Sequence, residues 1–311
     1  MSRTLEQKIQ HLYWLKSIGI DYYCSETIVT HSNSSTKNLD NDNMTALQPS
    51  SPTTKESAAI QVATTNARIN TGLSRSLTSP RNDVVPESLL QHAKTTESTP
   101  RNAEQAARHI ANSVTTLEEL KQSVLNFEGC TLKGFATNTV FADGNPNSQI
   151  MFIGEAPGAT EDQKGIPFCG ESGKLLDNML ACIGISRAVN AYITNTIFWR
   201  PPANREPTPE EISICKPFVE KHIALINPKL IVLVGSTAAT SLLGKHAGIS
   251  KIRQEYYSYT NQYLQKPIAT TAIFHPAYLL RQPMQKKTTW YDLIKIQQFI
   301  AENRLLSQTY L

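Results

Sequence analysis

The sequence has few cysteines and no apolar run long enough to cross a membrane. Its five cysteines, at positions 24, 130, 169, 182 and 215, are odd in number and not closely paired, which argues against a secreted disulfide scaffold. The first residues become amphipathic at once and lack the apolar centre of a signal peptide. We therefore expect a soluble, cytoplasmic protein.

Charged residues are also scarce, at 18% of the 311 positions. Basic residues still outnumber acidic ones, 30 to 26, so the net charge is +4. This mild excess is compatible with a polyanionic partner, although many unrelated proteins share it. A hydrophobic fraction of 40% can build a core, and the length allows one large domain or two small ones.

Apolar periodicity is missing from residues 25–102, which are rich in Ser, Thr, Asn and Pro. Such a segment buries too little surface to offset the entropy of ordering, so we predict a disordered linker there. Residues 1–24 predict a short N-terminal amphipathic helix, and residues 103–311 predict one folded domain. The apolar face of the N-terminal helix carries Leu5, Ile9, Leu12 and Leu15.

The folded segment alternates strand patterns with helix patterns. Four apolar, β-rich runs predict strands, at residues 149–154, 191–198, 229–235 and 268–274. Helical patterns occupy residues 116–125, 172–183, 209–226, 236–243 and 289–305. Strands that alternate with helices are parallel and covered on both faces. The sequence therefore predicts an α/β fold of three layers, α/β/α, with a central, mainly parallel four-stranded sheet.

Polar residues lie in or directly after three of these strands. Glu155 follows the first strand, Asn195 lies in the second, and His275 follows the fourth. Ligands of open α/β sheets bind outside the carboxyl ends of the strands, so we expect these side chains to converge on one crevice.

Each candidate residue also has a structural explanation when it is considered alone. Glu155 could satisfy backbone amides at a helix start. Asn195 could support its own strand, and His275 with the following proline could form an ordinary turn. Phe168, which follows the first strand at some distance, would usually belong to the core. Their convergence favours a common site over four separate structural roles.

Several motifs follow one another along the folded segment. The first is Gly154-Glu155-Ala156-Pro157-Gly158, then Glu161-Asp162, then Gly165-Ile166-Pro167-Phe168. The last is His275-Pro276-Ala277-Tyr278-Leu279-Leu280-Arg281. Between them lie Ile193-Thr194-Asn195 and Arg200-Pro201-Pro202-Ala203-Asn204-Arg205. In this order they resemble the motifs of the type-4 uracil-DNA glycosylases, whose two active-site motifs match the first and the last, and the resemblance covers about residues 115–300. It implies the uracil-DNA glycosylase fold and a DNA-repair enzyme.

The implied reaction is hydrolysis of the N-glycosidic bond of deoxyuridine in DNA, which releases uracil and leaves an abasic site. We expect it to be monofunctional and metal-independent. Positive charge develops on the sugar and negative charge on the departing base, and both need stabilisation. Glu155 is expected to orient the attacking water, and a neutral His275 to donate to uracil O2. Asn195 is expected to pair with uracil O4 and N3–H, and Phe168 to stack on the flipped base.

The resemblance also implies contacts with DNA that contains uracil. We expect Leu279 to fill the gap left by the flipped base and Arg281, Arg200 and Arg205 to hold phosphates, although any one arginine could be an ordinary surface charge. The protein is expected to be a monomer in a bacterial DNA-repair setting. Its N-terminal helix could dock on another repair or replication protein, or pack back on its own domain.

The cysteine pattern departs from that of the type-4 family. Its members usually hold a [4Fe–4S] cluster on four cysteines, and such a cluster normally needs four thiolates. Cys130 and Cys215 match the second and fourth ligands, whereas Phe127 and Trp199 stand at the first and third. Since Phe and Trp cannot ligate iron, we expect no cluster and no other cofactor, with the two aromatic rings packed in its place.

Residues 170–174, Gly-Glu-Ser-Gly-Lys, imitate part of a phosphate-binding loop. A true P-loop needs Gly where Phe168 stands and Ser or Thr where Leu175 stands, so we reject nucleotide hydrolysis.

Two alternatives to uracil release remain at this point. The same scaffold could act on hypoxanthine or another deaminated base, because pocket shape decides the substrate. It could also be a non-catalytic module that binds damaged DNA. Retention of Glu155, Asn195 and His275 together argues against that module.

Overall fold

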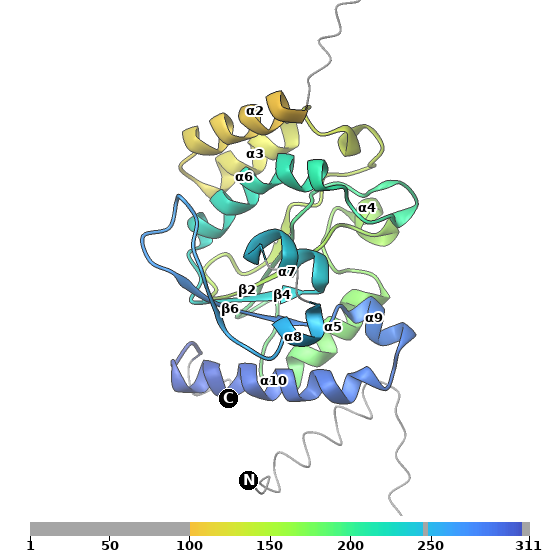
Figure 1. The fold of residues 1–311 in the computed structure, drawn as a ribbon, viewed down its shortest axis with the longest axis vertical. Helices are drawn as coiled ribbons and strands as arrows, with labels where there is room; N and C mark the ends of the chain where they lie inside the picture. Colours follow the sequence, from red (N-terminus) through yellow and green to blue (C-terminus); the bar gives the residue numbers. More distant parts are fainter. Residues whose placement is uncertain (1–99, 245–247, 307–311) are drawn as a thin grey trace, which may run out of the picture. The chain divides into compact units, whose positions relative to one another are not determined.

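Residues 100–244 and 248–306 are described by the computed structural model of this chain, whose arrangement is drawn in Figure 1. The expected N-terminal helix (1–24) lies outside the described residues, as does nearly all of the expected linker (25–102). The described part opens with helix α2, Pro100–Ser113, which begins slightly before the predicted domain boundary at residue 103.

A mixed sheet of six strands forms the centre of the described residues, in the order β1-β3-β2-β4-β6-β5. The four inner strands are parallel, and β1 and β5 pair antiparallel at the two edges. The strands are Ala142–Gly144 (β1), Ile150–Gly154 (β2), Tyr192–Asn195 (β3), Leu230–Val234 (β4), Tyr257–Tyr259 (β5) and Ile268–Ile273 (β6). The predicted α/β fold with four parallel strands is thus confirmed, and two short edge strands are added to it.

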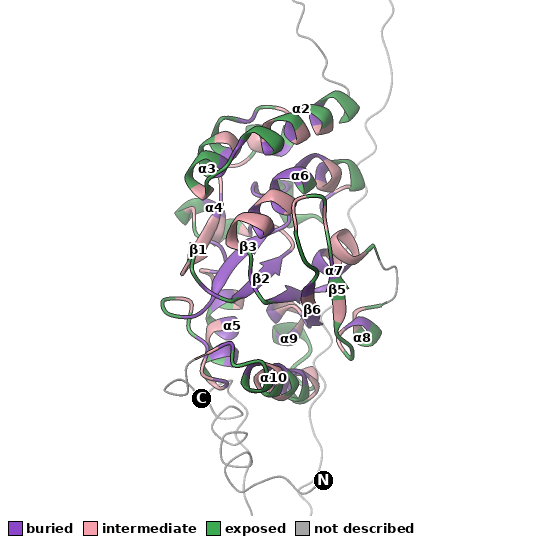
Figure 2. Cartoon of the chain, turned by 90° about the vertical axis from the view of Figure 1, so that its left-hand side faces the viewer, coloured by how far each residue is buried: buried purple, intermediate pink, exposed green. Residues whose placement is uncertain are grey.

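Strand residues alternate between two hydrophobic clusters because successive side chains of a strand point to opposite faces. In β2, Met151 and Ile153 belong to one cluster, whereas Ile150 and Phe152 belong to the other. All five residues of β2 and of β4 are buried, as expected for strands covered on both faces. Figure 2 shows the inner strands as a buried layer between helices with exposed outer surfaces.

Two groups of helices cover the two faces of the sheet (Figure 1). One face carries α6 and α7, with α2 and α3 packed behind α6, while the other carries α5, α9 and α10. Helix α2 approaches α6 closely through a stripe of small residues, Ala103, Ala107 and Ala111. The helices are Leu117–Asn126 (α3), Ala159–Lys164 (α4), Glu171–Ala181 (α5), Pro209–Ile226 (α6), Ser236–Leu243 (α7), Ile249–Ile252 (α8), Pro276–Arg281 (α9) and Gln285–Glu302 (α10).

Local signals set the bounds of the long helices. Helix α6 begins with a capping box between Thr208 and Glu211, has Pro209 in its first turn, and ends where Asn227 adopts a left-handed conformation with φ 48°. These features place α6 over the same residues, 209–226, that the sequence predicts. No helix among the described residues has the length and apolar character to cross a membrane.

Candidate active site

A cavity of about 730 Å³ opens at the carboxyl ends of β2, β3 and β6. Glu155, Asn195 and His275 all line it, so the structure brings together the three residues that the sequence placed at strand ends. Phe168, from the loop between α4 and α5, forms a further part of the wall. The cavity therefore has an acid, an amide, an imidazole and an aromatic ring within one enclosure.

His275 is the N-cap of α9, and its ring is fixed by that position. The backbone N–H of Ala277 donates to His275 Nδ1 over 3.1 Å, so in this arrangement the ring proton is on Nε2. Burial lowers the pKa of His275 to about 4, and the nearby positive charge of Arg281 acts in the same direction. The imidazole is therefore neutral at pH 7 and can donate one hydrogen bond from Nε2 into the cavity.

Glu155 lies directly after β2, and its backbone is anchored to the segment that follows β3. Its carbonyl oxygen accepts from Thr196 Oγ1 over 2.7 Å and from the N–H of Ile197 over 3.0 Å. Burial raises the pKa of Glu155, against the opposing effect of a hydrogen bond with Thr237, and the charge of Glu206 raises it further. A carboxylate of raised pKa is a stronger proton acceptor once it is ionised.

Asn195 ends β3 and offers an unused acceptor. Its Oδ1 is buried and has no hydrogen-bond partner among the residues that the structure describes. Buried polar atoms are nearly always paired, so an orphan that lines a cavity indicates a place for a ligand. The sequence assigned a role to Asn195 but none to Gly154, its register partner on β2. A Cβ at Gly154 would lie 2.5 Å from Asn195 Oδ1 and 2.5 Å from Phe168 Cζ, so glycine keeps this corner open.

Phe168 has an uncommon backbone conformation, with φ 51°. Its side chain is buried, and its ring centroid lies 5.7 Å from that of His275 at an interplanar angle of 32°. Gly173 in α5 allows this placement, since a Cβ there would clash with the carbonyl of Phe168. Gly173, which belongs to the segment that resembles part of a P-loop, thus has a packing role.

Only some of the residues that were expected to contact DNA lie at the surface. Leu279 is fully buried in the core cluster beneath α9, so its side chain would have to leave the core to insert into DNA as expected. The helix that starts at Pro276 turns position 279 inward, whereas Leu280 is 43% exposed. Arg281 is exposed and lines the cavity.

The two other expected phosphate contacts already have partners within the protein. Arg200 Nε donates to Asn204 Oδ1 over 2.7 Å. Arg205 makes a two-pronged ion pair with Glu211 of α6, with bonds of 2.6 and 2.9 Å. Arg205 still lines the cavity, as does Asn204, the partner of Arg200.

The model of the Uracil DNA glycosylase superfamily matches residues 141–294, which contain the sheet and the cavity. A type-4 uracil-DNA glycosylase of Sulfurisphaera tokodaii is 38% identical over 59% of this chain and 84% of its own length. A type-4 uracil-DNA glycosylase of Archaeoglobus fulgidus is 37% identical over 58% of this chain and 92% of its own length. One of Thermotoga maritima is 38% identical over 60% of this chain and 95% of its own length.

These relatives overturn the expectation that no cofactor is present. Type-4 uracil-DNA glycosylases are iron–sulfur enzymes, so the family of the relatives points to a [4Fe–4S] cofactor. That expectation rested on two residue identities, Phe127 and Trp199, and not on the property of the whole family.

The residues at the corresponding place in this structure supply two thiols. Cys130 and Cys215 are buried, and a hydrogen bond between them, together with burial, raises the pKa of the Cys215 thiol. In the same core cluster the rings of Phe127 and Trp199 stack with centroids 6.5 Å apart. Within the described ranges no group of three or more His, Cys, Asp or Glu side chains could hold a metal ion. These residues do not fit a complete four-thiolate site.

Proposed function

Because this chain belongs to the uracil-DNA glycosylase superfamily, we propose that its cavity hydrolyses the N-glycosidic bond of deoxyuridine in DNA and leaves an abasic site. The observation that carries the proposal is the meeting of a neutral imidazole donor, an unpaired amide oxygen and a carboxylate around one cavity. A base, a sugar and a water molecule need these three kinds of partner when the bond between base and sugar breaks.

In this mechanism a water oxygen bonds to C1′ of the sugar as the bond from C1′ to N1 of uracil breaks. The electron pair of the broken bond leaves with uracil, where negative charge spreads to O2. The Nε2 proton of His275 makes a hydrogen bond to that oxygen, and the ring does not itself lose or gain a proton. Glu155 opposes the positive charge on the sugar and accepts the proton that the water gives up.

Asn195 selects the base. Its Oδ1 can accept from uracil N3–H, which would satisfy the orphaned oxygen, and its amide can donate to O4. Cytosine presents the reverse pattern at these two positions and leaves both groups of Asn195 unpaired. Phe168 stacks on the flipped base beside His275.

The reaction is proposed to be monofunctional and to use no divalent metal ion. Cleavage of the strand through a Schiff base needs a lysine near C1′. No lysine lines the cavity among the described residues. The steps above use protein side chains and water alone.

A substrate panel tests the proposal. The full-length protein is incubated in EDTA with oligonucleotides that carry U:G, U:A, single-stranded U or hypoxanthine, and alkali then reveals abasic sites. We expect release of uracil in the wild type. Asn195→Ala is expected to slow it about 10- to 100-fold, the cost of leaving polar groups of the bound base unpaired. Gln122→Ala on the exposed face of α3 is the matched control.

Cleavage of hypoxanthine alone would keep the mechanism and change the substrate. A folded protein that binds DNA but cleaves none of the oligonucleotides would refute the enzymatic proposal in favour of a binding module.

We further propose Leu280, in place of Leu279, as the apolar side chain that fills the gap in the duplex. Leu280→Ala is expected to slow uracil release from duplex DNA about tenfold, with a smaller effect on single-stranded DNA, where no stacked gap must be filled. Leu279→Ala is expected instead to lower the free energy of unfolding by about 2–5 kcal/mol. Single-turnover rates on both substrates and urea denaturation measure the two effects. An equal effect of Leu280→Ala on both substrates would contradict the assignment.

A further inference from the structure

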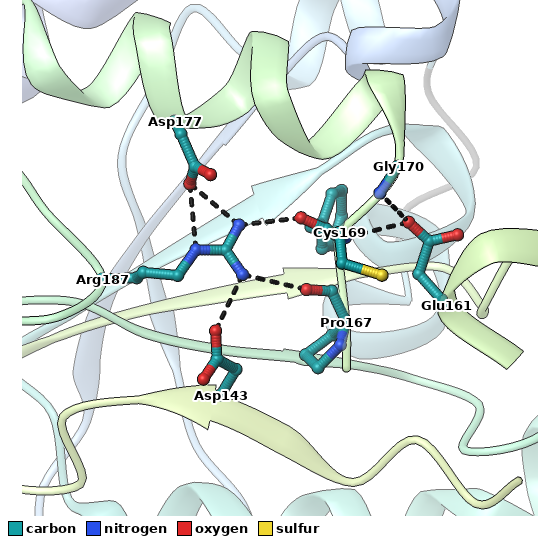
Figure 3. Close-up of polar contacts among 8 residues, drawn as sticks. Asp143, Glu161, Pro167, Cys169, Gly170, Asp177 and Arg187 are labelled. Atoms are coloured by element: carbon teal, nitrogen blue, oxygen red, sulfur yellow. Dashed lines mark hydrogen bonds and ion pairs between the residues drawn. The ribbon is translucent and has the colours of Figure 1, made fainter. Parts of the chain in front are cut away.

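The segment that carries Phe168 is held by two charged side chains, Arg187 and Glu161 (Figure 3), of which Glu161 also lines the cavity. We call residues 165–170, between α4 and α5, the Phe168 loop. Arg187, from the turn between α5 and β3, contacts carbonyl groups of this loop. Glu161 of α4 contacts its amide groups. Neither Arg187 nor Glu161 has a role in the reaction described above.

Arg187 uses its whole guanidinium group at this place. Nη1 donates to the carbonyl of Pro167 over 3.0 Å, and Nη2 donates to the carbonyl of Phe168 over 2.8 Å. The other three bonds go to carboxylates, from Nε and Nη2 to Asp177 (3.0 and 2.8 Å) and from Nη1 to Asp143 (2.9 Å). A guanidinium has five N–H groups, and all five are used here. Asp177 in α5 and Asp143 in β1 thus fix the direction in which Arg187 reaches the loop.

Glu161 completes the hold from the other side of the loop. Its Oε1 accepts from the N–H of Cys169 over 3.0 Å and from the N–H of Gly170 over 2.8 Å. Arg187 therefore binds two consecutive carbonyls of the loop, and the oppositely charged Glu161 binds the next two amides. Charge-assisted hydrogen bonds of this kind are stronger and more directional than neutral ones.

The hydrogen bonds from Arg187 and Glu161 act around Phe168, the residue of the loop with the least favourable backbone conformation. Phe168 sits at φ 51°, a conformation that residues with a Cβ rarely adopt, so it persists only where the surroundings impose it. Its carbonyl is clamped by Arg187 and lies against Gly173, and its ring stands beside His275. Release of the carbonyl would let the backbone relax and turn the ring away from the base.

We propose that Arg187 is a positioning residue for base recognition, which with Glu161 holds the Phe168 ring in the plane that the flipped base needs. The inference rests on the proposed function, since it assumes that Phe168 stacks on the base. Lysine cannot replace Arg187, because an ammonium group cannot span two carbonyls and two carboxylates in fixed directions. Glutamine can replace Glu161, because its amide oxygen can still accept from both N–H groups.

The test measures the inhibition constant of free uracil and the separate values of KM and kcat in the full-length protein. Arg187→Ala and Arg187→Lys are expected to raise the uracil inhibition constant and KM, with kcat/KM lowered about 10²-fold, the usual cost of misplacing a binding group by about 1 Å. Glu161→Ala should behave in the same way, whereas Glu161→Gln should restore the wild-type constants. Phe168→Ala should remove most of the effect of Arg187→Ala, because the two act through the same ring.

Val124→Ala, in α3 and in the other core cluster, is the control for lost stability alone. It should lower Tm and leave the uracil constant unchanged. If Arg187→Ala gives the same pattern, the positioning role is overturned. It is equally overturned if the effects of Arg187→Ala and Phe168→Ala are additive. Should Arg187→Ala fail to fold, Asp177→Asn, which weakens two of the five bonds that direct the guanidinium at the loop, should still raise the constant, and an unchanged constant would overturn the positioning role. A wild-type protein that neither binds nor releases uracil would instead refute the proposed function.

Discussion

Replacement of His275 with alanine is expected to slow uracil release by about 10²–10³-fold, because it removes the donor aimed at the negative charge that develops on the base. The tautomer of the ring determines which nitrogen donates. Nδ1 is occupied by the N–H of Ala277, so the single proton of the neutral ring is on Nε2 and faces the cavity. Single-turnover rates at saturating enzyme isolate the chemical step and measure the effect.

The pH dependence of the rate tests whether His275 acts as a neutral donor and Glu155 as the titrating group. The pKa of His275 is lowered to about 4, so the ring is neutral at every pH well above that value and no change in rate should occur near pH 6.5, where an ordinary histidine titrates. Glu155 must be ionised to accept a proton, and burial raises its pKa above the usual 4.5. The rate should therefore fall on the acid side as Glu155 becomes protonated.

Two variants separate the contributions of these groups. His275→Ala should be slow at all pH values yet retain the acid limb, because Glu155 is still present. Glu155→Gln should be slow and should lose most of that limb. An acid limb centred near pH 6.5 that disappears in His275→Ala would mean that the histidine is the titrating group, and the neutral-donor assignment would be wrong.

The sequence predicts the parts of this fold that follow from strong local patterns. The four inner strands are rich in apolar and β-branched residues, and α6 carries both a capping box and a well-placed proline, so their positions could be read directly. The edge strands β1 and β5 have three residues each, which is too short for an alternation to be recognised. The convergence of Glu155, Asn195 and His275 was predictable because it depends on topology alone.

Details of side-chain direction could not be predicted in the same way. Leu279 was expected at the DNA because it matches the apolar residue that the family inserts from the loop after its His-Pro pair. Pro276 in fact starts a helix, and the helical phase turns position 279 into the core and leaves 280 outside. Arg187 belongs to no motif, and its importance appears only when the loop it binds and its two carboxylate partners are seen together. Contacts between segments far apart in sequence have no local signal.

The second large effect is expected from the smallest change, Gly154→Ala. Gly154 ends β2, pairs in register with Asn195, and points to the same face of the sheet as Phe152, the face on which Phe168 packs. A methyl group there would lie 2.5 Å from both Asn195 Oδ1 and Phe168 Cζ, closer than van der Waals contact allows. Either the amide or the ring must move.

The ring cannot readily move, because its backbone is fixed by Arg187, Glu161 and the close approach of Gly173. The displacement therefore falls on groups proposed to recognise uracil. Gly154→Ala is expected to lower kcat/KM by at least about 10²-fold, the loss associated with misplacement of a binding group by roughly 1 Å. Gly134→Ala is the matched control, since a Cβ at that exposed glycine meets nothing within 4 Å.

A double variant decides whether space alone is responsible. Phe168→Ala removes one of the two atoms that the new methyl group would strike, so Gly154→Ala should cost much less in that background than in the wild type. Equal losses in both backgrounds would point to damage elsewhere in β2. Full activity of Gly154→Ala on uracil would show that binding of the base does not require the open space at Gly154. The proposed binding position between Asn195 and Phe168 would then be wrong.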